Sequence, residues 1–528
     1  MSGGITRRRL AVRALAYLAT SAVAGCAVGP NYHTPSVRVP AHYVVLTDVA
    51  DSTPRATGAD LATWWQALGD PELDSLIRRA AAGSPSAILA LDRLQAARIY
   101  EAGLTGNVLP AVDASGAFGR GTGDDLTRGR AGEPLISSDD THGLTNVEAI
   151  GGFDAVWQID VFGKVRREME QARYNTQVAA DARNAVLVSV IADVAQSYVD
   201  LRALQTRASV LRSAASVLQR GLDIVTQRYQ RGITNELDVM LAKRELDSVE
   251  AQIPLIDAEV SSGEYAIAAL LGKYPEDVVH ELAPPHMIPA APTAISPGLP
   301  LDLLRRRPDV AEAEREIASE NAGIGIATAS LFPQLFATAG VGAQRGSLGA
   351  ATLGEHIWSA GPGVVWPLLD FGQLDARVQI ANVRTRAALE NYRATIQQAV
   401  RQVDSNVARF GAAQQSVRSL GDALVASQQA VTLATERYQR GLTDYLNVVD
   451  AERAEYSIEG QYAEMQATVD GQFIQMYRDL GGGWQGLQKL PPIRRPLPAV
   501  VAIFRDTLAR NDPLAHGRAA IASSSRDR

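Results

Sequence analysis

Few residues of this chain have the types and spacing that covalent chemistry requires. The 528 residues include seven histidines, and these show no metal-ligand spacing: His33, His42, His142, His280, His286, His356 and His516. The sequence also has no nucleophile elbow, no phosphate-binding loop and no dinucleotide fingerprint. It therefore predicts a protein that is not an enzyme and that uses no metal ion or cofactor.

The one cysteine of the chain, Cys26, ends a pattern that could direct a covalent modification. The basic residues 7–9 precede an apolar segment, 10–22, and then Val23-Ala24-Gly25-Cys26. This order is typical of an export signal, and the apolar segment is shorter than the roughly 20 residues that a membrane-spanning helix needs. The small residues before Cys26 are similar to the lipobox of bacterial lipoproteins, which implies cleavage before Cys26 and its lipidation. An ordinary secretory signal followed by a chance cysteine is the alternative.

Composition and charge exclude further classes of protein. Apolar residues make up 46% of the chain and charged residues 21%, which is typical of folded proteins. The net charge is -7, and basic runs occur only at 7–9 and 305–307, so no basic stripe could follow a nucleic-acid backbone. No later segment approaches 18 consecutive apolar residues, so we expect no membrane-spanning helix.

The two halves of the chain repeat each other at an offset of 209 residues. The sequence Arg228-Tyr-Gln-Arg-Gly-Ile-Thr234 recurs as Arg437-Tyr-Gln-Arg-Gly-Leu-Thr443, and 11 of 19 positions are identical between 226–244 and 435–453. The same offset pairs Trp157 with Trp366 and Gly163 with Gly372. Such a long constant register predicts two copies of one structural plan.

Each copy is predicted to contain two strands that follow a proline-terminated helix. We expect helices at 71–107 and 301–331, strands at 111–119 and 335–345, and polar loops at 120–146 and 346–356, each followed by a second strand. In 147–161 the apolar residues Val147, Ala149, Phe153, Ala155, Trp157, Ile159 and Val161 share one face, and Glu148, Asp154, Gln158 and Asp160 share the other. This alternation is a weak signature of an outer-membrane strand, and a soluble hairpin is the alternative.

Long helical hairpins are predicted after the strands. Residues 164–231 and 373–440 contain no proline, and 68 helical residues would extend about 100 Å. Apolar residues recur at coiled-coil spacing at Ala208, Leu211, Ala215, Leu218, Leu222, Val225 and Tyr229, and at Val403, Phe410, Val417, Leu424, Val431 and Tyr438. We expect Gly232 and Gly441 to end these helices and Thr234 or Thr443 to cap the return helices, 235–271 and 444–480.

Four strands cannot close a lipid-exposed barrel by themselves, because single-chain barrels begin at eight strands. Open sheet edges in hydrocarbon would leave backbone groups unpaired at a cost of roughly several kcal/mol each. The chain is therefore expected to assemble. Three copies would supply twelve strands, although the pattern alone fixes neither this number nor a helical cylinder below the strands.

Further segments carry a family resemblance. They are Trp157-Gln-Ile-Asp-Val-Phe-Gly163, Trp366-Pro-Leu-Leu-Asp-Phe-Gly372, Leu304-Arg-Arg-Arg-Pro-Asp-Val310, Gly29-Pro-Asn-Tyr32 and both Arg-Tyr-Gln-Arg-Gly turns. Together they resemble the TolC family of outer-membrane factors, in its OprM/NodT lipoprotein branch. The resemblance implies a mixed α+β fold: a trimeric outer-membrane β-barrel with four strands per chain, continued by a long periplasmic α-helical coiled-coil barrel, with internal duplication.

The resemblance also implies a domain plan, partners and a location. The expected segments are a signal peptide (1–25), a lipidated N-terminal linker (26–60), a first repeat (61–271), an equatorial linker (272–300), a second repeat (301–480) and a C-terminal equatorial segment with a disordered tail (481–528). The implied partners of the homotrimer are outer-membrane lipid, a periplasmic adaptor and an inner-membrane pump of the RND type. The expected function is passive export of small molecules through an outer-membrane duct. A lipid-anchored periplasmic adaptor or scaffold is the alternative.

Site residues follow from the resemblance position by position. Asp450 and Leu446 match a periplasmic constriction, Asp238 is the nearest acid of the first copy, and Tyr438 matches a gate position. Asn447 stands where some relatives have a second acid, so a double acidic ring is not expected. The hairpin tips Arg231, Gly232, Arg440 and Gly441 are the expected adaptor contact. A solvated aspartate at position 450, surface arginines, and core packing for Tyr438 and Tyr229 are the alternative roles.

Overall fold

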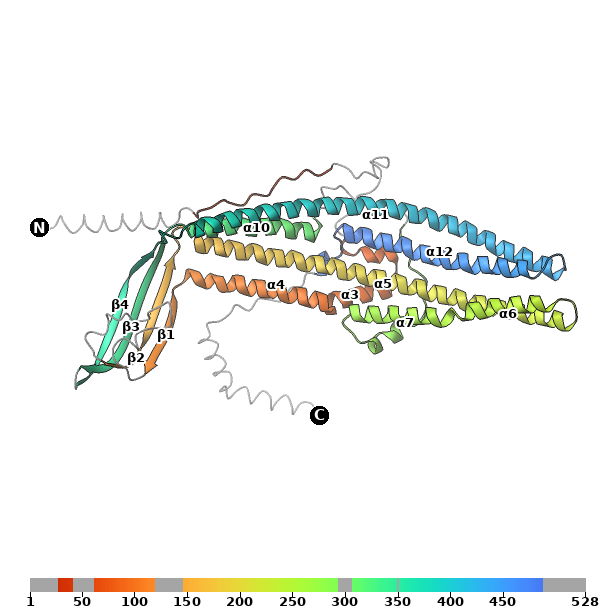
Figure 1. The fold of residues 1–528 in the computed structure, drawn as a ribbon, viewed down its shortest axis with the longest axis horizontal. Helices are drawn as coiled ribbons and strands as arrows, with labels where there is room; N and C mark the ends of the chain where they lie inside the picture. Colours follow the sequence, from red (N-terminus) through yellow and green to blue (C-terminus); the bar gives the residue numbers. More distant parts are fainter. Residues whose placement is uncertain (1–26, 41–60, 119–145, 293–305, 349–350, 488–528) are drawn as a thin grey trace, which may run out of the picture.

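A computed structural model of the chain describes residues 27–40, 61–118, 146–292, 306–348 and 351–487. The protein is elongated, with a β-sheet at one end, two helical hairpin turns at the other, and long helices between them (Figure 1). The expected signal peptide, Cys26, most of the loop 120–146, the Pro-rich segment 491–498 and the C-terminal tail lie outside the described residues.

The sheet has four antiparallel strands in the order β1-β2-β3-β4. Their bounds are Ala111–Phe118 for β1, Asn146–Ile159 for β2, Gln334–Leu348 for β3 and Ala351–Val365 for β4. The pairing of Phe153 with Val341, and of Val341 with Trp358, places these exposed apolar side chains on one face. Asp113 pairs with Asp154 on the other face. The predicted alternation is confirmed for residues 153–159 of β2.

Three details of the strand prediction are wrong. The register of β2 shifts between Val147 and Ala149, so one alternation does not run through the whole strand. Asp160 and Val161 lie beyond the end of β2, and the Asp160 carboxylate accepts hydrogen bonds from the backbone of α5 instead. The expected loop 346–356 is mostly strand, because pairing between β3 and β4 holds its glycines and small polar residues extended.

The predicted long helices are confirmed. Helix α5 spans Lys164–Gln230 and α11 spans Gln373–Gln439, and each has 67 residues. Helix α10, Pro308–Ala329, packs against both of them. The seam residues Ala208, Leu218, Val225, Val403, Phe410 and Tyr438 are buried. Tyr229 was expected on the seam but is 43% exposed, and Arg228, about 100° away around the helix, contacts the ring of Tyr438 instead.

Two helices that we expected to be continuous are broken at prolines. The first stretch divides into α3, Pro71–Gly83, and α4, Pro85–Leu104. The first return helix divides into α6, Glu236–Glu250, and α7, Ile253–Leu270. Each break precedes a proline, Pro85 or Pro254, which lacks the backbone N–H that a helix interior requires. The second return helix, α12, is unbroken over Leu446–Asp479.

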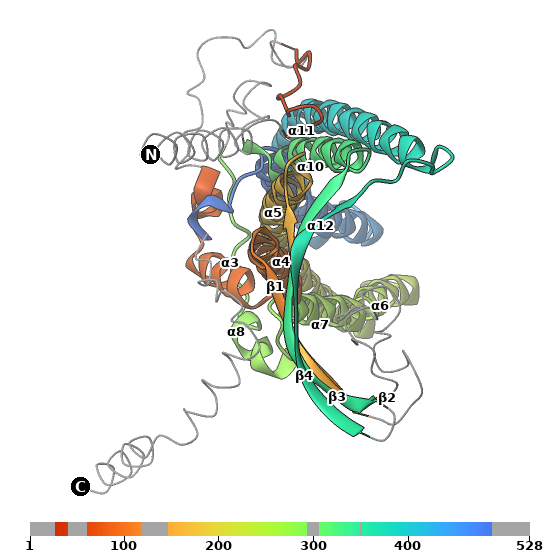
Figure 2. The same ribbon diagram turned by 90° about the vertical axis from the view of Figure 1, so that its left-hand side faces the viewer.

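The largest apolar core lies midway along the molecule. The short helix η2, Trp64–Leu68, packs with α3, α5, α7 and α12 there, and Figure 2 shows α3 and the short helix α8, Val279–Leu282, to one side of the long helices. Within the described ranges, no helix is both long enough and apolar enough to cross a bilayer.

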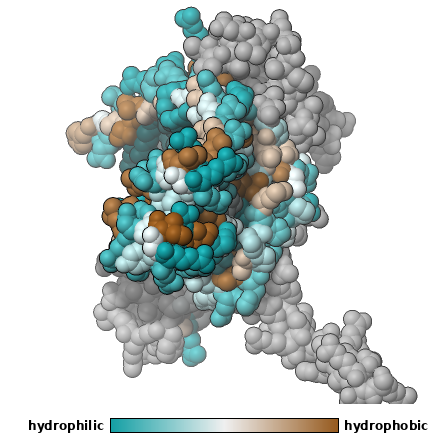
Figure 3. Space-filling model, turned by 90° about the vertical axis from the view of Figure 1, so that its right-hand side faces the viewer, coloured by the Kyte–Doolittle hydropathy of each residue, from teal (hydrophilic) through white to brown (hydrophobic). Residues whose placement is uncertain are grey.

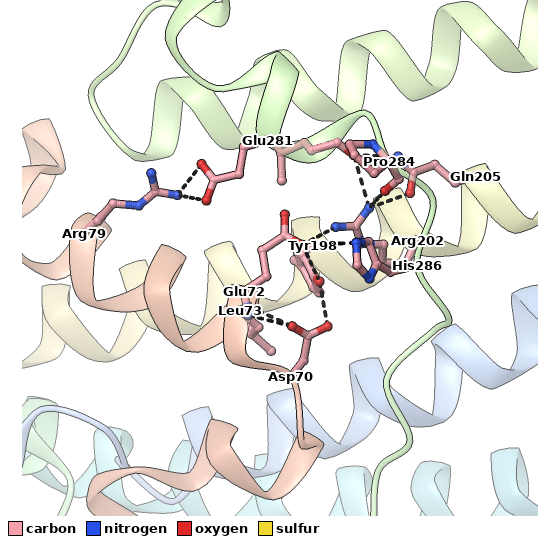
Figure 4. Close-up of polar contacts among 11 residues, drawn as sticks. Asp70, Glu72, Leu73, Arg79, Tyr198, Arg202, Gln205, Glu281, Pro284 and His286 are labelled. Atoms are coloured by element: carbon pink, nitrogen blue, oxygen red, sulfur yellow. Dashed lines mark hydrogen bonds and ion pairs between the residues drawn. The ribbon is translucent and has the colours of Figure 1, made fainter.

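A buried polar network connects three separate segments beside this core (Figure 4). The fully buried Arg202 of α5 donates to Glu72 at the start of α3 and to the carbonyl oxygens of Leu282 and Pro284, at 2.7, 3.1 and 2.9 Å. Asp70 caps α3 by accepting from the backbone N–H groups of residues 72 and 73, and it also accepts from the hydroxyl of Tyr198 at 2.6 Å. These bonds compensate the cost of burying a guanidinium group.

Replacing Asp70 with alanine should lower the free energy of unfolding by about 1–2 kcal/mol, because it removes the cap of α3 and the acceptor for Tyr198. The matched control is Asp92→Ala on the exposed side of α4, which should change it by less than about 0.5 kcal/mol. Urea unfolding followed by far-UV circular dichroism measures both. Equal effects of the two substitutions would contradict the role given to Asp70.

Candidate functional site at the hairpin ends

The two hairpin turns have the same backbone geometry. Gly232 and Gly441 follow the ends of α5 and α11 with φ of +70° and +72°. The backbone N–H of Gly232 donates to the carbonyl oxygen of Tyr229, and that of Ile233 donates to Arg228. The second turn has the same two bonds, from Gly441 to Tyr438 and from Leu442 to Arg437. This pattern is a Schellman motif, so the predicted role of both glycines in ending the helices is confirmed.

The predicted threonine caps are wrong. Asn235 caps α6, with its side-chain oxygen 3.0 Å from the backbone nitrogen of Asp238. Thr234 instead donates its hydroxyl to the carboxylate of Asp238. In the second hairpin Thr443 accepts from the side chain of Asn447 at 2.7 Å, and α12 begins without a side-chain cap. An asparagine next to the threonine takes the cap in the first turn because its side chain also reaches the third backbone N–H.

Tyr438 packs between the two hairpins. It is 6% exposed, and it belongs to an apolar cluster with Val225, Ala242, Tyr445, Val448 and Val449. Its ring lies 4.8 Å from the guanidinium carbon of Arg228 and 5.2 Å from the ring centre of Tyr445. Burial raises the pKa of Tyr438, with a smaller contribution in the same direction from the nearby charge of Asp238. Of the predicted gate residues, Tyr438 packs between the two hairpins, whereas Asp238 bonds to Thr234 within the first hairpin.

The other predicted site residues lie on the surface. Asp450 and Leu446 are exposed on α12, and Asp450 forms no ion pair or hydrogen bond with the described part of the chain. Arg231 and Arg440 are exposed at the tips. Gly232 and Gly441 face open space, since a Cβ atom at either position would meet no atom within 4 Å. The single chain therefore leaves both the expected constriction and the expected contact surface uncovered.

A clamp of three residues ties the hairpins together further from the tips. Glu245 of α6 is 2% exposed, and both of its carboxylate oxygens accept from the guanidinium group of Arg453 on α12. The hydroxyl of Tyr456 donates to the same carboxylate at 2.7 Å. The hydrogen bond from Arg453 is the main reason that the pKa of Glu245 lies below its ordinary value of 4.5. We call Glu245, Arg453 and Tyr456 the hairpin clamp.

Sequence reasoning missed this clamp, although one signal was present. Glu245 lies at seam spacing among the buried Ala242, Leu246 and Val249 of α6. A carboxylate at such a position requires a partner from the facing helix, because an unpaired buried charge is costly. The partner itself could not be read from α6, since Arg453 lies more than 200 residues away in the sequence.

The carboxyl group of Glu452, near the clamp, has a pKa that is shifted in the opposite direction to that of Glu245. Burial raises the pKa of Glu452 to about 7, and the nearby charges of Glu455 and Glu245 act in the same direction. Neighbouring Tyr445 is also buried, and its hydroxyl has no hydrogen-bond partner among the described residues. A Cβ atom at Gly221 would lie 2.6 Å from this hydroxyl, so the glycine leaves room for it.

Apolar side chains gather at the hairpin ends. Figure 3 looks onto this end of the molecule and shows hydrophobic surface surrounded by hydrophilic surface. The exposed apolar residues of the tips and the adjoining turns are Ile233, Leu237, Met240, Leu442 and Leu446. Among the described residues no group of three or more histidine, cysteine or acidic side chains could hold a metal ion. The tips therefore combine exposed apolar side chains with the exposed charged side chains of Arg231 and Arg440.

Comparison with known proteins covers most of the chain. A family model described as outer membrane efflux protein matches residues 76–273 and 299–482. The nodulation protein T of Rhizobium leguminosarum bv. trifolii is 27% identical over 435 residues, 82% of this chain and 89% of its own length. The solvent efflux pump outer membrane protein SrpC of Pseudomonas putida is 26% identical over 479 residues, 89% of this chain and 98% of its own length.

A solved structure agrees with the sequence comparison. The outer-membrane channel OprN is 30% identical, superposes with a TM-score of 0.75, and matches 87% of this chain and 100% of its own. This likeness confirms the expected TolC-like protomer, which is mostly helical with a small sheet.

The clamp leads to a prediction for a double-mutant cycle. Glu245→Gln and Arg453→Gln should show a coupling free energy of about 1–3 kcal/mol at pH 7, because the carboxylate is buried while the arginine is partly exposed. The folded-state pKa of Glu245 is depressed, so the coupling should be complete above about pH 5 and should disappear as the pH falls through the lower folded-state pKa.

The matched control is the exposed pair Lys243 and Asp247 on the same helix, with a coupling below about 0.5 kcal/mol expected for Lys243→Gln and Asp247→Asn. Hydrogen exchange of the α6 amides measures the local stability. A clamp coupling as small as that of the control pair, or one that is already lost above the ordinary glutamate pKa of 4.5, would be inconsistent with this assignment.

Proposed function

Because the chain belongs to the outer membrane efflux protein family, we propose that it is the outer-membrane channel subunit of a tripartite efflux system and exports small molecules passively through a trimeric duct. The observation that carries the proposal is the match to the efflux family along nearly the whole of α3 to α12. Relatives in this family are named as outer membrane proteins of solvent and toluene efflux pumps. The family transports and does not catalyse, which supports a role without enzymatic activity.

The sheet supports assembly into a barrel. Strands β1 and β4 are the outer strands of the four-stranded sheet, so each leaves one row of backbone groups without a partner in the same sheet. One face carries exposed apolar side chains, including Trp358 and Val341. In hydrocarbon, unpaired backbone groups cost roughly several kcal/mol each, and pairing of β1 with β4 of a neighbouring copy removes the cost. Three copies then form a barrel whose apolar face meets lipid and whose polar face, with Asp113 and Asp154, lines the duct.

The hairpin ends form the periplasmic gate in this proposal. Leu446 and Asp450 of the three copies face the axis and narrow the duct, and three carboxylates close together favour cations over anions. Behind them, Tyr438 packs between the two hairpins of each copy, and Asp238 lies in the first turn of α6. The exposure of Asp450 and its lack of a partner among the described residues support a role directed at the lumen.

The tips are the contact for a periplasmic adaptor, which links the channel to an inner-membrane pump of the RND type. Arg231 and Arg440 supply charge, while Gly232 and Gly441 add no side chain at the tips. Exposed Ile233 and Leu442 beside them supply apolar contact area.

The N-terminus carries the lipid anchor. Cleavage after the signal peptide 1–25 and lipidation of Cys26 attach the chain to the outer membrane, and Ala27 at the next position fits that destination in this family. The two repeats, 61–271 and 301–480, arise from one duplicated plan and are joined by the linker 272–300. The family resemblance assigns the chain that follows residue 481 to a C-terminal equatorial segment and a tail.

The proposal predicts the electrical behaviour of the purified trimer. Wild-type trimers in a planar bilayer should give small cation-selective openings, and Asp450→Ala should enlarge them or reduce their selectivity, because it removes the acidic ring. Asp444→Ala, an exposed acid on the turn before α12, is the matched control and should leave both unchanged. Folded trimers that conduct no current would favour a lipid-anchored periplasmic scaffold and reject the channel.

The adaptor contact predicts a separate outcome. The double substitution Arg231→Glu and Arg440→Glu should reduce recovery of the adaptor about tenfold or more after cross-linking in the source cells and affinity purification, since it reverses two charges at the contact. Arg401→Glu on the exposed side of α11 is the control. Unchanged recovery with the tip variant would exclude the tips as the contact.

A further inference from the structure

The first residues of the described chain lie across the junction between the sheet and the helices. The backbone nitrogen of Val28 donates to the carbonyl oxygen of Phe162, in the connection between β2 and α5, at 3.1 Å. The chain then passes along α5 and α10, which belong to different halves of the sequence. Residues 27–34 therefore contact both halves at the sheet end of the helices.

One buried arginine makes most of the polar contacts to this segment. Arg167 of α5 is 3% exposed. Its guanidinium group donates to the carbonyl oxygens of Val28 and Gly29, both at 3.2 Å, and to the side-chain oxygen of Asn31 at 2.9 Å. Its remaining terminal nitrogen pairs with Glu170 at 2.7 Å. Arginine suits this position because its planar group offers five donors in a fixed arrangement.

The segment approaches the helices more closely than side chains would allow. Gly29 has a φ of +89°, and a Cβ atom there would lie 2.6 Å from the Cα atom of Gly325 on α10. A Cβ atom at Gly163, just before α5, would lie 2.6 Å from the Cα atom of Ala27. Glycines at these positions let the backbone of residues 27–29 rest directly on the junction.

Contacts further along the segment hold it on α10. The side chain of Asn321 donates to the carbonyl oxygen of Pro30 at 3.0 Å. The hydroxyls of Tyr32 and Thr34 donate to the same carboxylate oxygen of Glu314 at 3.2 and 3.3 Å. The segment is thus held along its whole length and not only at Arg167.

We propose that this junction is a seat that fixes the attachment point of the N-terminal lipid at the sheet end of the helices, with Arg167 as its positioning residue. The inference rests on the proposed lipidation of Cys26. Ala27, which follows Cys26 directly in the sequence, contacts Gly163 at this junction. Acyl chains on Cys26 therefore start where the membrane-facing strands end.

Without the seat, the lipid would restrain the channel only weakly. The next described contacts of the chain are those of Val37 and Val39, which pack against an apolar cluster, so a released linker of about ten residues could extend about 35 Å. A lipid on such a tether would keep the protein near the membrane but would not set its depth or its orientation. Holding residues 27–34 shortens the tether to a single residue.

Hydrogen–deuterium exchange of the full-length lipidated trimer, resolved by mass spectrometry, tests the seat. The peptide that covers residues 27–34 should be protected in the wild type. Arg167→Gln should speed its exchange about tenfold or more, because three hydrogen bonds to the segment are lost. Arg173→Gln, exposed on the same helix, is the matched control and should exchange like the wild type.

Two more variants separate positioning of the segment from general stability. Gly29→Ala changes only the segment, and it should also speed exchange about tenfold or more while the unfolding midpoint of the trimer stays unchanged, because the added methyl group meets Gly325. Arg167→Lys keeps the charge beside Glu170 but not the fork of donors, so it should preserve the midpoint without restoring full protection.

The same spectra give the mass of the N-terminal peptide. An acylated Cys26 with a segment that exchanges as fast as an unfolded peptide would overturn the seat and leave the lipid anchor intact. A protected segment with an unmodified Cys26 would overturn the anchoring role, and with it the lipidation in the proposed function. If both Arg167→Gln and Gly29→Ala leave the protection of residues 27–34 unchanged, the role of Arg167 and Gly29 in positioning the segment is overturned.

Discussion

Backbone hydrogen bonds that must be made away from water constrain this protein more than any other interaction. Along the helices the requirement is met within each segment, so α5 and α11 can each extend over 67 residues. In the sheet it is met only between strands, and the outer strands β1 and β4 each keep one open edge. One face of this sheet is also apolar and exposed. Pairing with further copies of the chain would satisfy the backbone groups of the open edges, and it would join the apolar faces into one lipid-facing surface. The proposed trimer follows from this constraint together with the family relationship.

The helical part combines an apolar seam with a few buried polar contacts. Apolar packing alone would allow the hairpins to slide past each other, because it is not directional. The hairpin clamp and the Arg202 network each require a particular register, since a shift by one residue would leave Glu245 or Arg202 buried without its partner. The two lie at different heights, one near the tips and the other beside the central core. Between them they fix α6 to α12 and α3 to α5.

Periodic features were predictable from the sequence, and contacts between distant segments were not. The long helices, the glycines that end them and the faces of β2 follow from spacing that a single segment contains, as Gly232 and Phe153 show.

The breaks at Pro85 and Pro254 were missed because the apolar pattern continues across them. The loop expected at 346–356 is strand because β3 and β4 pair, which local composition does not reveal. The partners of Glu245, and the N-terminal partners of Arg167, lie more than 100 residues away, so only the fold identifies them. The proposed gate and adaptor contacts were assigned by family resemblance, and the fold of one chain leaves them as proposals.

The positions of these contacts along α5 suggest how the two ends of the molecule differ. Arg167 lies in the first turn of α5 and Arg228 in its last, about 90 Å apart at 1.5 Å per residue. At the sheet end, the N-terminal segment joins α5 to α10 through charged hydrogen bonds and direct backbone packing. At the tip end, α5 contacts the second hairpin through the ring of Tyr438, and α6 is separated from α7 by the break before Pro254.

A bend at residues 251–252 would let α6 move together with the clamp while Ile267 and Leu271 stay in the central core. In the proposed channel, motion that opens the duct is therefore expected at the tips, and the sheet end is expected to remain fixed.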